Sequence, residues 1–180
     1  MINKIKDLFS KKNNSVFIIA EIGSNHSNDI NIAKKLIRIS KNAGADAVKF
    51  QSFKAKTLYS KYVPRRTLPN GKKGPNIYKM IQSIEMPYEW HNKLKKYCDK
   101  LNIIFISTPF DEEALNSLEE IDCQIYKIAS SEIGDQNLVK KIAKTKKPII
   151  ISTGKSKLIE VKRAIKWIEK TGNKKIIILH

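Results

Sequence analysis

Arginine is scarce in this sequence, although the chain is strongly basic. The 180 residues carry a formal net charge of +18, and the 35 basic side chains include only Arg38, Arg65, Arg66 and Arg163 as arginines. Because arginine is the preferred side chain for bidentate contacts with phosphates and bases, its scarcity argues against a nucleic-acid-binding protein. The lysines are spread along the whole chain, so we attribute the charge to a compositional bias that can also help to gather an anionic substrate.

Long hydrophobic runs are absent as well. No stretch approaches the roughly 20 apolar residues of a membrane-spanning helix, and the first ten residues lack the apolar core of a secretory signal. Hydrophobic residues make up 41% of the chain and charged residues 29%, which is typical of a folded domain. We therefore expect a cytoplasmic protein that has no membrane partner.

Cysteine occurs only twice, at Cys98 and Cys123, without the spacing of a metal site. Isolated thiols are most often small core residues. We predict that both are buried and that neither forms a disulfide or acts in catalysis.

Six short segments are almost continuously apolar and rich in β-branched residues. Such runs are typical of strands that are buried on both faces of a parallel sheet. The six runs lie at Phe17–Ile22, Ala47–Phe50, Ile103–Ile106, Ile125–Ile128, Pro148–Ile151 and Lys175–Leu179.

Segments with helical spacing of apolar residues lie between these runs. Asp111 and Ser156 are placed to cap two of the helices, and Gly44 and Gly172 are placed to end two of them. His91 lies on a predicted helix, where we expect it at the surface. The apolar stripes that define the helices are Ile32–Leu36–Ile39–Ala43, Trp90–Leu94–Tyr97–Leu101, Leu138–Ile142–Ala143 and Val161–Ile165–Ile168, with a further helix over Glu112–Glu120.

Two stretches interrupt this rhythm. Residues 1–15 are polar and read as an N-terminal extension with one helical turn, followed by one domain over 16–180. Residues 52–86 form an insertion rich in proline and glycine, in which we predict a long loop and a short helix near Ile77–Ile84. Long loops at one edge of a sheet often cover an active site, and Asn76 is a candidate substrate contact there.

The alternation of strands and helices predicts a parallel sheet with right-handed crossovers. A doubly wound nucleotide-binding sheet requires a turn such as GxGxxG after its first strand, whereas this chain has Gly23-Ser24-Asn25-His26. A barrel instead places polar functional residues at the carboxyl ends of many strands. The sequence follows the barrel pattern, so we predict a fold of the TIM (β/α)8 class.

Lys49 and Lys127 stand inside apolar strands. Because an unpaired ammonium is costly to bury against the helices, we expect both to point into the barrel mouth, where they can meet an anion. The alternative is a lysine that pairs with a carboxylate of the barrel. The hydroxyls of Thr108, Ser130 and Ser152 recur at three successive strand ends and strengthen the prediction of an anion pocket.

Glu21 ends the first predicted strand and can accept a proton or a hydrogen bond from a sugar hydroxyl. An ion pair with one of the two lysines is an alternative that is compatible with this role. Gln51 ends the second strand, and Asn25 and His26 follow the first, so these three are further candidates for substrate contacts.

Five motifs in collinear order resemble the bacterial sialic acid synthase (N-acetylneuraminate synthase) family over about residues 16–180. They are Phe17-Ile-Ile-Ala-Glu-Ile-Gly-Ser-Asn-His26, Ala43-Gly-Ala-Asp-Ala-Val-Lys-Phe-Gln51, Ser107-Thr-Pro-Phe-Asp111, Tyr126-Lys-Ile-Ala-Ser130 and Ile151-Ser-Thr-Gly154. The family includes synthases for N-acetylneuraminate, legionaminate and pseudaminate.

The resemblance implies a TIM-barrel enzyme that is dimeric, cytoplasmic and dependent on a divalent metal, Mn²⁺ or Mg²⁺. Such enzymes condense phosphoenolpyruvate with an N-acylated amino sugar such as N-acetylmannosamine and release phosphate. By this resemblance the positions that hold phosphoenolpyruvate are Lys49, Thr108, Lys127, Ser130 and Ser152. Glu21 matches a catalytic carboxylate that faces the sugar, and Gln51 matches a neighbouring contact.

The resemblance also marks what this sequence does not contain. The family barrel has eight strands and an antifreeze-like domain after them, and its metal-binding histidines follow the sixth strand. Only about six βα units are present here, so we expect no metal ligand in this chain. We further expect an incomplete barrel with little or no synthase activity alone. A non-catalytic remnant of the family, or a related phosphoenolpyruvate aldolase, remains as the alternative.

Overall fold

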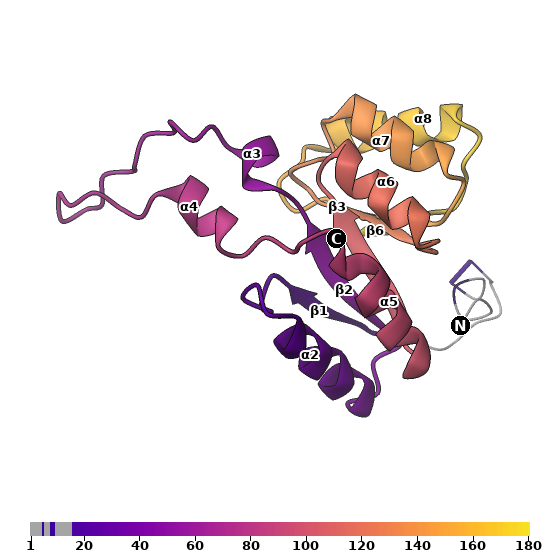
Figure 1. Cartoon of the computed structure of the whole chain (residues 1–180). Helices are drawn as coiled ribbons and strands as arrows, with labels where there is room; N and C mark the ends of the chain where they lie inside the picture. Colours follow the sequence, from indigo (N-terminus) through magenta and orange to yellow (C-terminus); the bar gives the residue numbers. More distant parts are fainter. Residues whose placement is uncertain (1–4, 6–7, 10–15) are drawn as a thin grey trace.

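The computed structural model describes residues 5, 8–9 and 16–180, and its centre is one six-stranded parallel sheet (Figure 1). The strands follow each other in space in the order of the sequence, from β1 to β6. Their bounds are β1 Ile19–Gly23, β2 Ala47–Ser52, β3 Ile104–Pro109, β4 Tyr126–Ile128, β5 Ile149–Ser152 and β6 Ile176–Leu179. All six predicted strands are therefore confirmed, and the sheet curves into half of a barrel.

Helices connect successive strands and cover one face of the sheet (Figure 1). Their bounds are α2 Ile30–Asn42, α3 Ala55–Leu58, α4 Ile77–Gln82, α5 Trp90–Lys100, α6 Glu112–Glu120, α7 Gln136–Lys144 and α8 Leu158–Lys170. Among the described residues, none of these helices has the length and apolar character needed to cross a membrane.

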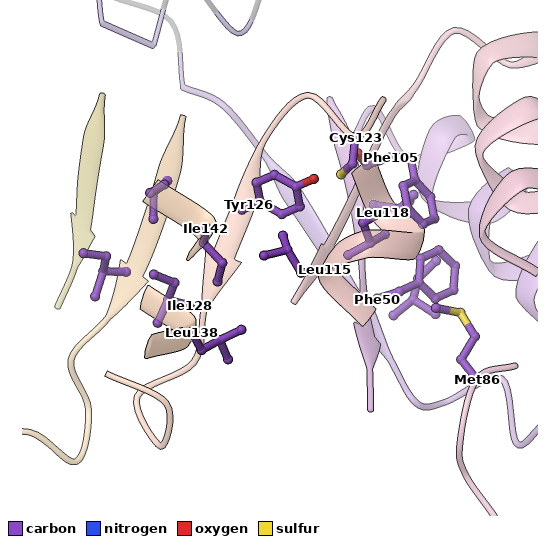
Figure 2. Packing of buried hydrophobic residues seen from close by; sticks show 14 of the residues in the cluster. Phe50, Met86, Phe105, Leu115, Leu118, Cys123, Tyr126, Ile128, Leu138 and Ile142 are labelled. Atoms are coloured by element: carbon purple, nitrogen blue, oxygen red, sulfur yellow. The ribbon is translucent and has the colours of Figure 1, made fainter. Parts of the chain in front are cut away.

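The alternation of side chains along each strand divides the interior into two clusters. On β2, Val48 and Phe50 pack toward the helices, whereas Ala47 packs on the opposite face. Figure 2 shows the helix-side cluster, in which Phe50 and Phe105 stack with ring centroids 5.6 Å apart. The cluster on the other face gathers Ala47, Ile104, Ile106, Ile125 and Ile150. The strands are thus buried on both faces, which explains why their sequences are almost continuously apolar.

Helix caps agree with the sequence at one predicted position and differ at the other. Asp111 caps α6 by accepting a hydrogen bond of 2.7 Å from the backbone N–H of Ala114. The prediction that Ser156 caps α8 is wrong, because the cap residue is Lys157, whose backbone N–H donates to the Glu160 carboxylate at 2.7 Å. The carboxylate of Glu160 satisfies the helix start from within the first turn, so no hydroxyl cap is needed.

The insertion between β2 and β3 projects away from the body of the molecule and carries α3 and α4 (Figure 1). The predicted short helix is confirmed as α4, whereas the single turn of α3 carries too little periodicity to be predicted. Glu85 joins the two ends of the insertion by accepting a hydrogen bond of 2.5 Å from the backbone N–H of Ala55.

Most of the predicted extension over residues 1–15, with its helical turn, lies outside the described residues. Of the three described positions in it, Ile5 is buried and packs with the cluster that contains Ile104 and Ile125. Both cysteines are buried and free, as predicted.

Candidate active site

A cavity of about 370 Å³ lies at the carboxyl ends of the strands, and every strand of the sheet contributes to it. The polar side chains that line it are Glu21, Lys49, Gln51, Thr108, Lys127, Ser130 and Ser152. The apolar part of the wall comes from Ile19, Phe110, Ala129 and Leu179. The parallel direction of all six strands explains this convergence, because it brings the polar residue at each strand end to the same edge of the sheet.

Lys49 is held at the junction of β1, β2 and β3. Its ammonium forms an ion pair with Glu21, which stands opposite it in the β1–β2 register. The Lys49 ammonium also donates to Thr108 Oγ1 at 3.5 Å. The side chain is buried, whereas the Glu21 side chain is half exposed. The ion pair that the sequence left open as an alternative is therefore present, and it keeps both groups at the cavity wall.

Lys127 lies on the other side of the same cavity. Its ammonium donates to Ser152 Oγ on β5 and to the Ile128 carbonyl at 3.4 Å. The pKa of Lys127 is lowered to about 8, mainly by burial and also by the positive charge of Lys49, while Glu21 acts in the opposite direction. Two ammoniums next to one carboxylate give the cavity net positive character, which suits an anionic ligand.

Gly23 makes room for the polar groups on β1 and β2. A Cβ atom at this position would lie 3.2 Å from Glu21 Oε1 and 3.6 Å from Gln51 Nε2. The backbone also has φ of +57° here, which glycine adopts without strain. The glycine after the first strand therefore lets the Glu21 and Gln51 side chains lie close together.

Three predicted substrate contacts are not brought to this cavity. His26 is buried on the helix side, where its ring lies 6.3 Å from Phe50 and 5.9 Å from Trp90, centroid to centroid. Asn25 lies exposed in the turn after β1. Asn76 caps α4 by accepting from the backbone N–H of Lys79 at 3.0 Å. Contacts of these residues with a substrate stay a prediction.

His91 corrects a further expectation, because it is fully buried instead of lying at the surface. Its Nε2 is 2.8 Å from Ser52 Oγ, and its Nδ1 is 2.8 Å from Ser117 Oγ. Ser52 Oγ is in turn 2.6 Å from Ser107 Oγ. This network ties α5 and α6 to the ends of β2 and β3, next to the strand positions that carry Gln51 and Thr108. Burial lowers the pKa of His91 to about 4, with a further contribution from Lys54.

Sequence reasoning missed Phe110, which closes one wall of the cavity, and Glu132, which lies in a neighbouring cavity. Both follow predicted strand ends by a few residues, so position alone could have suggested them. Glu132 is half buried, and burial raises the pKa of its carboxyl group.

A metal centre needs several convergent ligands, and the residues present were expected to hold none. Within residues 5, 8–9 and 16–180, no group of three or more His, Cys, Asp or Glu side chains is placed to bind a metal ion. The polar lining of the cavity is dominated by ammonium, hydroxyl and amide groups, which suit an anion better than a cation.

Solved structures with the same architecture include synthases of the TIM-barrel type. N-acetylneuraminic acid synthetase from Leptospira borgpetersenii superposes with a TM-score of 0.82 and 32% identity, over 93% of this chain and 54% of the synthetase. A DAHP synthase from Thermotoga maritima has a TM-score of 0.66 at 16% identity, which supports the fold alone. The predicted fold class is thereby confirmed.

Sequence comparison gives a consistent result. The chain is 44% identical to the N,N'-diacetyllegionaminic acid synthase of Campylobacter jejuni over 91% of its length, and 38% identical to the pseudaminic acid synthase of Helicobacter pylori over 90%. It spans about half the length of these relatives. The model of the NeuB family matches residues 36–180. The chain therefore belongs to the NeuB family.

Proposed function

We propose that this chain forms the phosphoenolpyruvate-binding part of a synthase that condenses phosphoenolpyruvate with an N-acylated amino sugar and releases phosphate. The observation that carries the proposal is the convergence of Lys49 and Lys127 on one cavity at the strand ends. Membership of a family whose named members make sialic, legionaminic and pseudaminic acids supports it. By the same reasoning we propose a cytoplasmic enzyme that works as a homodimer.

The cavity offers complementary partners to both ends of phosphoenolpyruvate. The ligand carries a carboxylate and a phosphate on three carbons, and charge-assisted hydrogen bonds to ammonium groups are the strongest contacts available to them. Lys49 and Lys127 supply these charges, while Thr108, Ser130 and Ser152 supply directed hydroxyls. In the proposed complex, hydrogen bonds from the two ammoniums to the phosphate compensate for part of the hydration that these ammoniums lose on burial.

In the proposed reaction, C3 of phosphoenolpyruvate attacks the aldehyde carbon of the open-chain sugar and forms the new carbon–carbon bond. The aldehyde oxygen takes a proton and becomes a hydroxyl. Water then adds at C2, where positive charge has developed, and phosphate leaves with cleavage of its C–O bond to give a 2-keto acid. Glu21 is the carboxylate that can stabilise this positive charge or accept a proton from the water.

No three His, Cys, Asp or Glu side chains of the described residues are grouped to hold a divalent metal, so no step above is routed through one, and Glu21 is the described group to which we give a chemical role. Gln51 lines this cavity and the neighbouring one, and its side-chain amide can hydrogen-bond a hydroxyl of the acceptor sugar.

The proposal is tested by measuring phosphoenolpyruvate binding to the 180-residue chain by isothermal titration calorimetry. Lys127→Met removes one of the two buried ammoniums, and we expect it to weaken binding at least about tenfold, because hydrogen bonds to charged groups contribute roughly 1.5–3 kcal/mol each. Lys162→Met, on the exposed face of α8, is the matched control and should bind as the wild type does. Equal affinity of the wild type and Lys127→Met would overturn the proposal.

A further inference from the structure

Three polar side chains lie fully buried behind the wall of the cavity at the strand ends. They are Ser52 at the end of β2, Ser107 on β3 and His91 on α5. Their neighbour in the helix-side cluster is Phe105 (Figure 2), whose ring centroid lies 6.5 Å from that of His91. Polar groups are costly to bury among apolar ones unless each of them finds a hydrogen-bond partner.

The three groups satisfy one another, with one further hydroxyl from α6. The hydroxyl of Ser52 lies 2.8 Å from His91 Nε2 and 2.6 Å from the hydroxyl of Ser107, while Ser117 Oγ lies 2.8 Å from His91 Nδ1. Burial lowers the pKa of His91 to about 4, so the ring is neutral near pH 7. A neutral imidazole donates at one nitrogen and accepts at the other. The ring therefore orients the hydroxyls on both sides, and we call these four side chains the serine–histidine network.

Ser52 joins the carboxyl ends of β2 and β3 in two ways. The register of the two strands ends at the pair of Ser52 and Pro109, and there the Ser52 carbonyl accepts from the backbone N–H of Phe110 at 3.0 Å. The side chain adds the bond to Ser107. Since the ladder of backbone hydrogen bonds ends at this level, the side-chain bond is an additional restraint on how the two strand ends lie against each other.

The cavity uses the opposite face of the same strand ends. Successive side chains of a strand point to opposite faces, so Thr108 lines the cavity while Ser107 points toward the helices. Thr108 Oγ1 on β3 accepts from the Lys49 ammonium on β2 at 3.5 Å. This distance is at the long limit for a hydrogen bond. A small shift of one strand end against the other therefore decides where the Thr108 hydroxyl lies relative to an anion in the cavity.

We propose that His91 is a positioning residue for Thr108. It acts through the hydroxyls of Ser52 and Ser107, and the contact that it maintains is the hydrogen bond from Thr108 to an anion in the cavity. His91 itself is not among the residues that line the cavity. The inference rests on the proposed function, because the anion whose affinity it concerns is phosphoenolpyruvate.

The test measures phosphoenolpyruvate affinity of the 180-residue chain by isothermal titration calorimetry. His91→Phe keeps a ring beside Tyr88 but removes both nitrogens, and Ser52→Ala removes the hydroxyl next to the strand ends. Each should weaken binding at least about fivefold, because a displaced Thr108 loses much of a hydrogen bond to a charged ligand. The double variant should bind no more weakly than the weaker single variant, since both changes cut the same chain of bonds. Ser107→Ala takes the place of Ser52→Ala should that variant not fold.

Ser117→Ala is the matched control, because it removes the other hydroxyl that lies 2.8 Å from the ring, on the side of α6. It should lose stability in urea unfolding but keep the affinity of the wild type. A spectroscopic signature separates positioning from a general loss of stability. In chains labelled with ¹³C at the threonine methyl groups, the Thr108 signal is identified by its absence in Thr108→Ser. It should move in ligand-free His91→Phe and Ser52→Ala and stay in place in Ser117→Ala.

The outcomes separate the inference from the proposed function. Wild-type affinity in a folded His91→Phe, or an unmoved Thr108 signal in it, would overturn the inference and leave the proposed function standing. Equal losses of affinity in Ser52→Ala and Ser117→Ala would overturn it as well, because the effect would then be one of general stability. If the wild type does not bind phosphoenolpyruvate, the proposed function fails, and the Thr108 signal of the ligand-free chain still decides whether the network positions this side chain.

Discussion

At the scale of a residue, the burial of the Lys127 ammonium destabilises the folded chain and at the same time prepares the group to bind an anion. Its ammonium is buried beside a second ammonium, so the folded chain disfavours its charged form and its pKa falls to about 8. The lowered pKa means that the charged ammonium reduces the free energy of unfolding. This loss of stability is complete below pH 8 and disappears as the pH rises from 8 toward the unfolded pKa of 10.5. An anion in the cavity would reverse this sign, because it favours the charged ammonium.

We predict that phosphoenolpyruvate affinity depends on pH through Lys127. Below about pH 7 the ammonium is charged, so affinity should be constant with respect to this group. Above pH 8 a proton must be taken up on binding, and the affinity should fall, approaching tenfold per pH unit. Calorimetric titrations between pH 6.5 and 9.5 measure this. Lys127→Arg keeps its charge throughout and should flatten the profile; an identical slope in this variant would contradict the assignment.

His91 gives a second prediction at this scale. Because its pKa is about 4 in the folded chain and 6.5 in the unfolded chain, the unfolded chain binds more protons between these values. The stability from the neutral ring is therefore complete above pH 6.5 and is lost as the pH falls to 4, by about 3 kcal/mol. Urea unfolding of the wild type and of His91→Gln should show a stability gap at pH 7 that shrinks by pH 4. A gap independent of pH would contradict this.

The candidate site could be predicted from the sequence only where backbone geometry alone decides. Lys49, Thr108 and Lys127 lie inside or at the end of strands, so the two-residue period fixes which way they point. His91 could not be predicted, since its burial depends on Ser52 and Ser117, which are distant in sequence. Asn76 caps α4, and its contact with a substrate stays a prediction, because nothing local in the sequence distinguishes an asparagine that caps a helix from one that binds a ligand.

At the scale of elements, two carboxylates of the α6 region hold the insertion: Asp111, and Glu113, which lies 3.7 Å from the Lys56 ammonium on α3. Asp111 caps α6 and also accepts from Thr57 and Tyr88, so it joins α3, the start of α5 and α6. Asp135 caps α7 in the same way, with 2.9 Å to the backbone N–H of Leu138. Among the described contacts, Asp111 bonds to the insertion, whereas the side-chain hydrogen bonds of Asp135 go to the start of α7.

We therefore predict different consequences for Asp111→Ala and Asp135→Ala. Each should lower stability by about 1 kcal/mol through the lost cap, and Asp111→Ala by somewhat more because two further donors lose their partner. Only Asp111→Ala should speed amide hydrogen exchange in α3, residues 55–58. Hydrogen-exchange mass spectrometry measures this. Faster exchange of α3 in Asp135→Ala would show that the effect does not depend on the hydrogen bonds from Thr57 and Tyr88 to Asp111.

The elements themselves were more predictable than their contacts. Apolar runs located all six strands because both faces of the sheet are covered, as Val48 and Ala47 on opposite faces of β2 illustrate. The start of α8 was predicted one residue early, because serine is a common cap residue and Ser156 precedes the helix. In the structure the Glu160 carboxylate, inside the first turn, accepts the hydrogen bond from the backbone N–H of the cap residue Lys157. The four-residue α3 is stabilised by tertiary contacts, which no local pattern contains.

At the scale of the whole molecule, the sheet has two edges, β1 and β6. An edge strand presents unpaired backbone groups, and an apolar edge invites pairing with another chain. On β6, Ile178 is 49% exposed and Leu179 is 43% exposed, and Ile18 beside β1 is 53% exposed. The net charge of +18 opposes association between copies at low salt, and salt screens this repulsion.

We predict that the 180-residue chain self-associates through β6 as salt is raised, and that Ile178→Lys suppresses this. A lysine at an edge blocks strand pairing by its charge and its hydration. Ile159→Lys adds the same charge at a side chain that is 68% exposed on α8, away from the sheet edge, and so controls for net charge. Light scattering at increasing chain concentration measures the association. The salt concentration is about 0.5 M, at which the Debye length is well below 10 Å. If Ile159→Lys suppresses it equally, charge repulsion between whole molecules, and not the edge of β6, governs the behaviour of the chain.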